Sequence, residues 1–139
     1  CPGFFTFQKD KIMAKIKLGS TPKTFKPVTV YVDLPDGSEG DIPLTFRYRT
    51  QDEYWEYRDE FFKAVGVERP AGDDTSLPVI AKEARLQAAK HIFQAIDSWD
   101  LDIELTPDNL CQMFNEIPQS SSAISEAYQS ACIQGRLGN

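Results

Sequence analysis

The sequence has few of the residues on which most enzyme sites depend. It contains a single histidine, His91. Its three cysteines are Cys1, Cys111 and Cys132, and their spacing matches no metal-binding or redox motif. Three thiols cannot all pair within one chain, so we expect reduced cysteines in a reducing compartment. No catalytic triad pattern, glycine-rich phosphate loop or dinucleotide fingerprint is present. The sequence therefore predicts no catalytic residue, no cofactor and no metal centre, and we expect the protein not to be an enzyme.

An excess of positive charge and long apolar runs are also missing. The formal net charge is -6, whereas nucleic acids and anionic membrane surfaces both require a cationic face. No apolar stretch approaches the length of about 20 residues that spans a membrane, and no signal peptide is recognisable. We therefore expect neither nucleic acid nor a membrane as a partner. At 139 residues, with 41% hydrophobic and 26% charged residues, the chain has the composition of one globular domain.

Residues 1–12 are predicted to be translated upstream or vector-derived sequence rather than part of the fold. Met13 begins a stretch that is typical of a bacterial N-terminus. The codons of Lys9-Asp10 can read AAGGAT, a purine-rich ribosome-binding sequence at a suitable distance before that methionine. The alternative is a genuine N-terminal arm. Codons without a GGA core at these two positions would contradict the leader hypothesis.

Two alternating segments joined by a turn predict a β-hairpin at about 27–49. Val28–Leu34 alternates apolar and polar residues, which is typical of a strand with one buried face. Pro35–Gly40 contains an Asp-Gly pair and supplies turn chemistry. Pro43 lacks an amide donor, so we expect its strand to begin there or to lie at a sheet edge. A two-stranded ribbon is marginal in water, so its apolar face must pack on helices or on a partner.

Four helices are predicted after the hairpin, and their ends carry recognisable signals. Thr50-Gln51-Asp52-Glu53 has the form of a capping box, and Thr106-Pro107 combines a capping residue with a first-turn proline. The predicted helices lie at about 51–65, 77–97, 107–117 and 120–134. Ser98–Leu105 is expected to be a connector. The fold class is therefore α+β, with an N-terminal β-hairpin followed by about four α-helices in a single domain over residues 13–139.

An acidic run follows the second predicted helix and consists of Asp97, Asp100, Asp102 and Glu104. Closely spaced oxygen ligands can hold Ca²⁺ or Mg²⁺, which makes a divalent-ion enzyme one alternative. The run lacks the central glycine and the distal glutamate of an EF-hand loop. We therefore favour a solvated acidic connector. His91, inside the second helix, is likewise interpreted as structural or solvated.

The first predicted helix is rich in aromatic residues. Tyr54, Trp55, Tyr57, Phe61 and Phe62 lie close together in the sequence and span an arc too wide for one buried stripe. Aromatic side chains are enriched at protein interfaces, so Tyr54, Trp55 and Phe62 are candidate partner-binding residues. The alternative is that the hairpin and the other helices cover all of them.

The C-terminal part carries a succession of short motifs: Trp99-Asp100-Leu101, Asn109-Leu110, Pro118, Ile124 with Tyr128, and Arg136-Leu137-Gly138-Asn139. This order resembles the tail assembly chaperones of long-tailed, siphovirus-like bacteriophages and prophages, and the resemblance runs from about Ile80 to Asn139. The motif positions join the aromatic residues above as candidate protein-binding or family-motif residues. The front half of the chain carries no such motif.

The resemblance implies a non-structural assembly factor in the cytoplasm of a bacterial host, absent from the mature virion. Such a protein binds the long, largely helical tape measure protein and keeps it soluble until tail tube subunits polymerise around it. Many members of the family also have a longer, frameshifted form that recruits tail tube protein, and this chain would correspond to the short form. Self-association through the hairpin edge or the aromatic helix is a further expectation. The alternatives are another phage tail or head–tail connector component retained in the virion, or a generic bacterial protein–protein adaptor.

Overall fold

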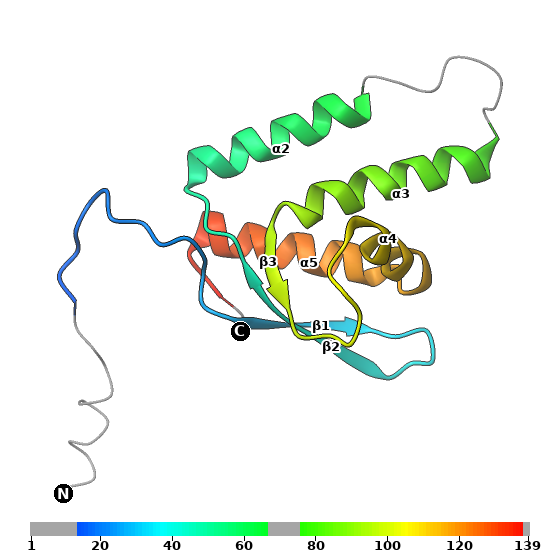
Figure 1. The fold of residues 1–139 in the computed structure, drawn as a ribbon, viewed down its shortest axis with the longest axis horizontal. Helices are drawn as coiled ribbons and strands as arrows, with labels where there is room; N and C mark the ends of the chain where they lie inside the picture. Colours follow the sequence, from blue (N-terminus) through cyan, green and yellow to red (C-terminus); the bar gives the residue numbers. More distant parts are fainter. Residues whose placement is uncertain (1–13, 67–75, 138–139) are drawn as a thin grey trace, which may run out of the picture.

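A computed structural model describes residues 14–66 and 76–137 and shows an antiparallel sheet combined with helices (Figure 1). The strands are β1 (Val28–Asp33), β2 (Glu39–Phe46) and β3 (Ile96–Trp99). The helices are α2 (Gln51–Gly66), α3 (Leu77–Phe93), α4 (Pro107–Glu116) and α5 (Gln119–Gln129), which continues into the π-helical turn η1 (Ser130–Gln134). The predicted α+β class, in a single small domain, is confirmed. The predicted leader, residues 1–12, lies outside the described residues.

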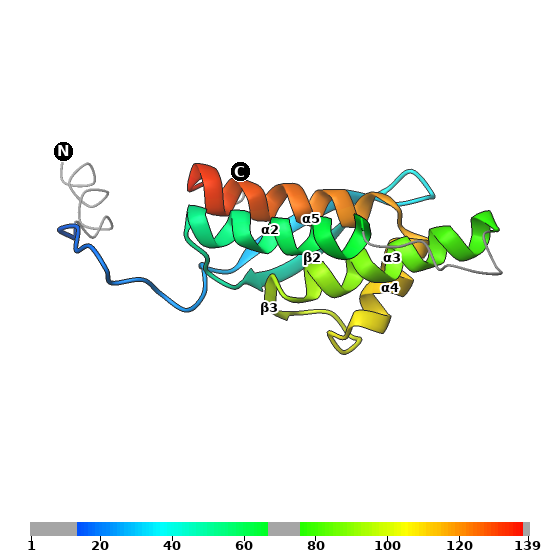
Figure 2. The same cartoon turned by 90° about the horizontal axis from the view of Figure 1, so that it is seen from above.

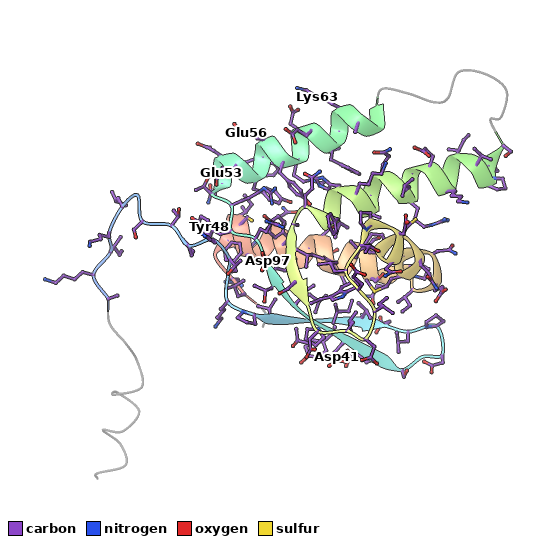
Figure 3. All side chains as sticks on the ribbon, in the orientation of Figure 1. Asp41, Tyr48, Glu53, Glu56, Lys63 and Asp97 are labelled. Carbon is purple, nitrogen blue, oxygen red and sulfur yellow. The ribbon has the colours of Figure 1, made fainter. Side chains whose placement is uncertain are left out.

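The strands are ordered β1-β2-β3, and both pairings are antiparallel. Period-two alternation gives the sheet one buried face, made by Val30, Val32, Ile42, Leu44 and Phe46. Asp41 projects from the opposite face, away from the helices (Figure 3). The β1–β2 turn is closed by the Asp36 carboxylate, which accepts hydrogen bonds from the amide and the hydroxyl of Ser38 at 2.9 and 2.6 Å.

β3 corrects the prediction of a helix to residue 97 followed by a connector. α3 ends at Phe93, and the amide of Ala95 turns back to the carbonyl of Ile92 at 2.9 Å. The carbonyl of Ala95 then accepts a hydrogen bond from the amide of Arg47 at 2.8 Å, and Ile96 pairs with Phe46. β3 therefore forms backbone hydrogen bonds with the side of β2 that does not pair with β1. This pairing with a distant part of the chain outweighs the helical pattern of the local sequence.

Pro43 lies inside the central strand, which corrects the expectation of a strand start or an edge position. It pairs with Thr29 on one side, and its carbonyl accepts a hydrogen bond from the amide of Asp100 at 2.9 Å on the other. Its missing N–H therefore faces the end of β3. The proline costs the β2–β3 ladder only its terminal bond.

The helices cover the buried face of the sheet. α5 runs along the β1 side, and α2 and α3 lie farther from the strands, so that α2 forms one border of the molecule (Figures 1 and 2). The largest completely buried side chains are Tyr128, Phe46, Ile96, Leu110 and Ile124. These side chains come from the sheet and from α4 and α5, and they form one core. None of the described helices is long and apolar enough to cross a membrane.

Replacing Phe46 with alanine should lower the free energy of unfolding by about 3–5 kcal/mol, because it removes a completely buried ring and leaves a cavity. Urea denaturation of the F46A variant measures this loss. Thr45→Ala, at the adjacent position on the opposite face, is the matched control and should cost less than about 1 kcal/mol. Equal losses for the two variants would contradict the assignment of the buried face.

Candidate protein-binding site

The start of α2 is fixed by the capping box that the sequence predicts. The amide of Glu53 donates to Oγ1 of Thr50 at 3.2 Å, and the amide of Thr50 donates to Oε1 of Glu53 at 2.9 Å. Both bonds satisfy amides at the helix start that have no partner within the helix. The predicted box is therefore confirmed, and it sets where the helical period begins.

Arg49, just before α2, ties the end of the sheet to three helices. Its Nη1 donates to the hydroxyl of Tyr128 at 2.8 Å and to the carbonyl of Gln94 at 3.2 Å. Its guanidinium lies 4.4 Å from the ring centroid of Tyr57, a cation–π contact. The hydroxyl of Tyr128 in turn donates to the carbonyl of Arg47 at 2.9 Å. Arg49 thereby holds α2, the end of α3 and α5 in one arrangement.

His91 fills the contact between α2 and α3. Its ring is stacked on Tyr57, with centroids 3.8 Å apart, and on Phe61, with centroids 4.3 Å apart. Nη1 of Arg58 lies 3.3 Å from Nε2 of His91. Arginine can only donate, so Nε2 accepts and the imidazole is neutral with its proton on Nδ1. Burial, followed by the charges of Arg58 and Arg49, lowers the pKa of His91 to about 4.

Burial of the two tyrosines keeps their hydroxyls protonated. It raises the pKa of both Tyr57 and Tyr128 above the ordinary value. Their hydroxyls therefore remain donors, to the carbonyl of His91 at 2.9 Å from Tyr57 and to Arg47 from Tyr128. Tyr57, His91 and Tyr128 therefore have their polar atoms hydrogen-bonded within the fold, and their role is structural.

Because Tyr54 and Tyr57 face the core, the helical period turns Trp55 and Phe62 outward. Trp55 is 52% exposed and Phe62 is 63% exposed. The two positions are seven apart and so share one face of α2. The guanidinium of Arg58 lies 5.4 Å from the ring centroid of Phe62 and covers only part of it. We call Trp55 and Phe62 the aromatic stripe.

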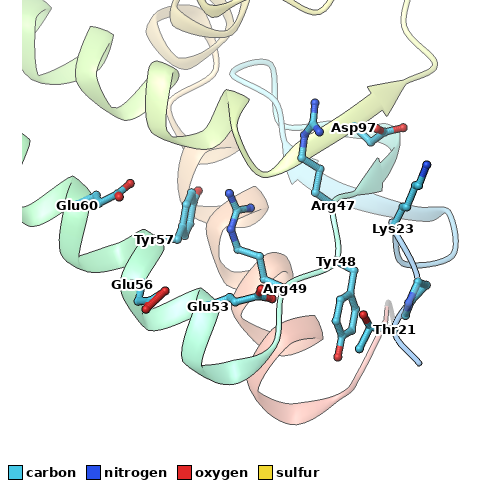
Figure 4. A pocket seen from close by; sticks show the side chains of 11 residues that line it. Thr21, Lys23, Arg47, Tyr48, Arg49, Glu53, Glu56, Tyr57, Glu60 and Asp97 are labelled. Carbon is cyan, nitrogen blue, oxygen red and sulfur yellow. The ribbon is translucent and has the colours of Figure 1, made fainter. Parts of the chain in front are cut away.

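A hollow of about 640 Å³ lies between the N-terminal segment and the other side of α2 (Figure 4). Its charged lining consists of Lys23, Arg47, Arg49, Glu53, Glu56, Glu60 and Asp97. The lining contains no histidine or cysteine, and Arg49 is already held by Tyr128. Small-molecule sites are mostly apolar. This hollow is a mixed-charge surface and offers no nucleophile paired with a base.

The C-terminal motif residues are mostly held inside the fold. Leu110, Ile124 and Tyr128 are buried. Asn109 closes the connector, because its Nδ2 donates to the carbonyl of Glu104 at 2.7 Å. Its amide also donates to Oγ1 of Thr106 at 3.0 Å, which confirms the predicted cap of α4.

The remaining motif positions lie at the surface or close to it. Trp99 is half-buried and its Nε1 donates to the carbonyl of Ile103 at 2.9 Å, while Leu101 packs against the core. Asp100, Pro118 and Arg136 are exposed. Gly138 and Asn139 lie outside the described residues. Within the described parts of the chain, no three Cys, His, Asp or Glu side chains gather so that they could hold a metal ion.

A family model described as phage tail assembly chaperone matches residues 13–139. The chain belongs to the phage tail assembly chaperone family. No curated protein and no solved structure matches it significantly. The family match covers the hairpin and α2 as well as the region from Ile80 onward that carries the resemblance. A tail assembly chaperone assists the assembly of tail proteins, which are its partners, and this role is not catalytic.

The stability of this tail assembly chaperone should decrease as the pH falls from about 6.5 towards 4. Folded His91 has a pKa of about 4, and the unfolded residue titrates near its ordinary value of about 6.5. The unfolded state therefore binds more protons in this window and is favoured as the pH falls, by on the order of 1–2 kcal/mol after allowance for solvent screening.

Urea denaturation between pH 6.5 and 5 measures this dependence, because ordinary carboxylates titrate below that range. His91→Gln keeps an acceptor for Arg58 but does not titrate, so the H91Q variant should show a much flatter pH dependence. The same slope in both proteins would assign the effect to another group.

Proposed function

We propose that this tail assembly chaperone binds the tape measure protein through the outer face of α2 and keeps it soluble during tail morphogenesis. The observation that carries the proposal is the aromatic stripe on α2, a helix that packs on α3 and η1 and turns Tyr54 and Tyr57 to the core. Exposed large aromatic side chains are typical of the centres of protein interfaces. The tape measure protein expected from the family resemblance is long and helical, and an amphipathic helix presents apolar residues at matching intervals.

The rigid support of α2 favours binding. Tyr54, Tyr57 and the Arg49 contacts fix the helix before a partner arrives, which lowers the entropic cost of association. The surrounding acidic residues Asp52, Glu56 and Asp59 keep the free surface hydrated. The free chaperone can therefore present aromatic rings to water without a large apolar patch.

The size of the stripe favours many copies on one partner. Covering roughly 100 Å² on each of the two rings contributes about 5 kcal/mol at about 25 cal/mol/Å². Association costs about 4–15 kcal/mol in lost freedom, so one stripe alone gives weak binding. Several chaperones along one long helical chain would gain affinity through avidity. This favours coating of the tape measure protein over a one-to-one complex.

The proposal places the chaperone in the host cytoplasm, without catalytic activity, and outside the mature virion. Tail tube protein is a second possible partner in the same assembly step. The competing function is a tail or connector component retained in the particle. Mass spectrometry of purified virions separates the two, and we expect the chain to be absent from them.

Replacing Trp55 and Phe62 with alanine should abolish solubilisation of the tape measure protein. The measurement is co-expression with the long helical protein encoded downstream, followed by a pull-down and size-exclusion chromatography. Loss of two interface anchors, each worth about 2 kcal/mol or more, lowers affinity by well over tenfold. Both side chains are exposed, so the melting temperature should change little.

Tyr31→Ala is the matched control for this experiment. Tyr31 is an exposed aromatic residue, 53% accessible, on the outer face of the sheet. The Y31A variant should solubilise the partner as well as the wild type does. Retained binding by the double variant, or an equal loss with Y31A, would contradict the assignment of the binding face to α2.

A further inference from the structure

Residues 14–20 form an arm that projects away from the domain (Figures 1 and 2). Every residue of the arm is exposed, and Ile16 and Leu18 are 89% and 93% accessible. The arm carries Lys15 and Lys17 and no acidic residue. It is therefore a basic segment with two uncovered aliphatic side chains in a chain whose net charge is -6.

A groove of about 470 Å³ lies beside β3 and the connector that follows it. Its floor is apolar and consists of Phe93, Ile96, Trp99, Leu101, Ile103 and Leu105. Its rim carries Asp97, Asp102 and Glu104, with Arg47 also among the lining residues. Ile103 is 48% exposed. Residues 92–135 contain no lysine, arginine or histidine, so Arg47, next to the end of β2, is the one cation among the groove's lining residues, against three carboxylates.

The arm and the groove are complementary in charge, and both present apolar side chains. In an extended segment, Ile16 and Leu18 lie on one side and Lys15 and Lys17 on the other. Once fully extended, Lys15–Leu18 would span about 13 Å at about 3.3 Å per residue, which equals the span of the four-residue strand β3. β3 is an edge strand, since only β2 pairs with it. Its open side can therefore accept an extended segment through backbone hydrogen bonds.

We propose that the arm of one copy docks in the β3 groove of a second copy. The occupant is a second copy because the arm extends away from its own domain, while its lysines and aliphatic residues match the acidic rim and apolar floor of the groove. Arm and groove are different surfaces, so the contact is heterologous and repeats head to tail into rings or open chains.

The docking is independent of the proposed tape measure contact. The groove and the aromatic stripe share no residue. A head-to-tail array would leave the stripe of every copy uncovered and would present many stripes to one long partner. Only the presentation of many stripes to the tape measure protein rests on the proposed function.

The test is sedimentation velocity and light scattering of the full chain at low and high salt. Wild-type protein should associate at low salt and dissociate at high salt, because exposed charge pairs are screened. An arm variant, K15E/K17E, and a groove variant, D102K/E104K, should each be monomeric. A control variant, E39K/D41K, reverses two exposed charges on the sheet away from the groove and should still associate.

Mixing the two inactive variants gives the decisive result. The groove variant has an intact arm and the arm variant an intact groove, so together they can form one interface and no more. We expect a one-to-one dimer that does not grow. A monomeric mixture, or monomeric wild type at low salt, would overturn the proposal. Monomeric wild type whose arm resists proteolysis until Lys15 and Lys17 are reversed would place the arm in its own groove and would equally overturn it.

Failure of this proposal is distinguishable from failure of the proposed function. The W55A/F62A variant keeps the arm and the groove, so it should self-associate like the wild type. The K15E/K17E variant keeps the aromatic stripe, so a single copy should still contact the tape measure protein.

Discussion

The guanidinium of Arg49 lies where the end of the sheet meets α2, the end of α3 and α5. It donates to the hydroxyl of Tyr128 and the carbonyl of Gln94 and lies over the ring of Tyr57. Arg49 is half-buried, and these partners replace the water that its burial removes. Once Tyr57 is held in this contact, the rotation of α2 about its axis is fixed. The outward position of Trp55 and Phe62 follows from the helical period, so the half-buried contact of Arg49 with Tyr57 helps to determine the exposed surface.

Local signals in the sequence predicted the parts of the fold that local interactions determine. The capping box at Thr50 and the cap at Thr106 form as their residue types require. β3 was missed because its strand conformation depends on pairing with β2, far away in the chain. The predicted hairpin also extended to residue 49. In the structure β2 ends at Phe46, and the side chain of Arg49 turns to Tyr128.

The candidate site likewise has features that the local sequence predicts and features that depend on packing between distant residues. The sequence narrowed the aromatic candidates to one helix but not to its exposed members, because the packing of Tyr54 and Tyr57 against other elements decides which side faces water. The motifs that carry the family resemblance include core residues such as Leu110 and Ile124. The proposed contact surface lies instead in the half of the chain without a recognisable motif. The buried motif residues of this chain therefore report its fold.

Trp55 itself provides the most direct test of the account. The chain has two tryptophans, so Trp99→Phe leaves Trp55 as the only one. Fluorescence of the W99F variant is measured during titration with a purified helical segment of the tape measure protein. We expect a blue shift and protection from acrylamide quenching, because the half-exposed ring becomes covered. A complex that forms while the emission and quenching of Trp55 stay unchanged would contradict the claim that α2 is the binding face.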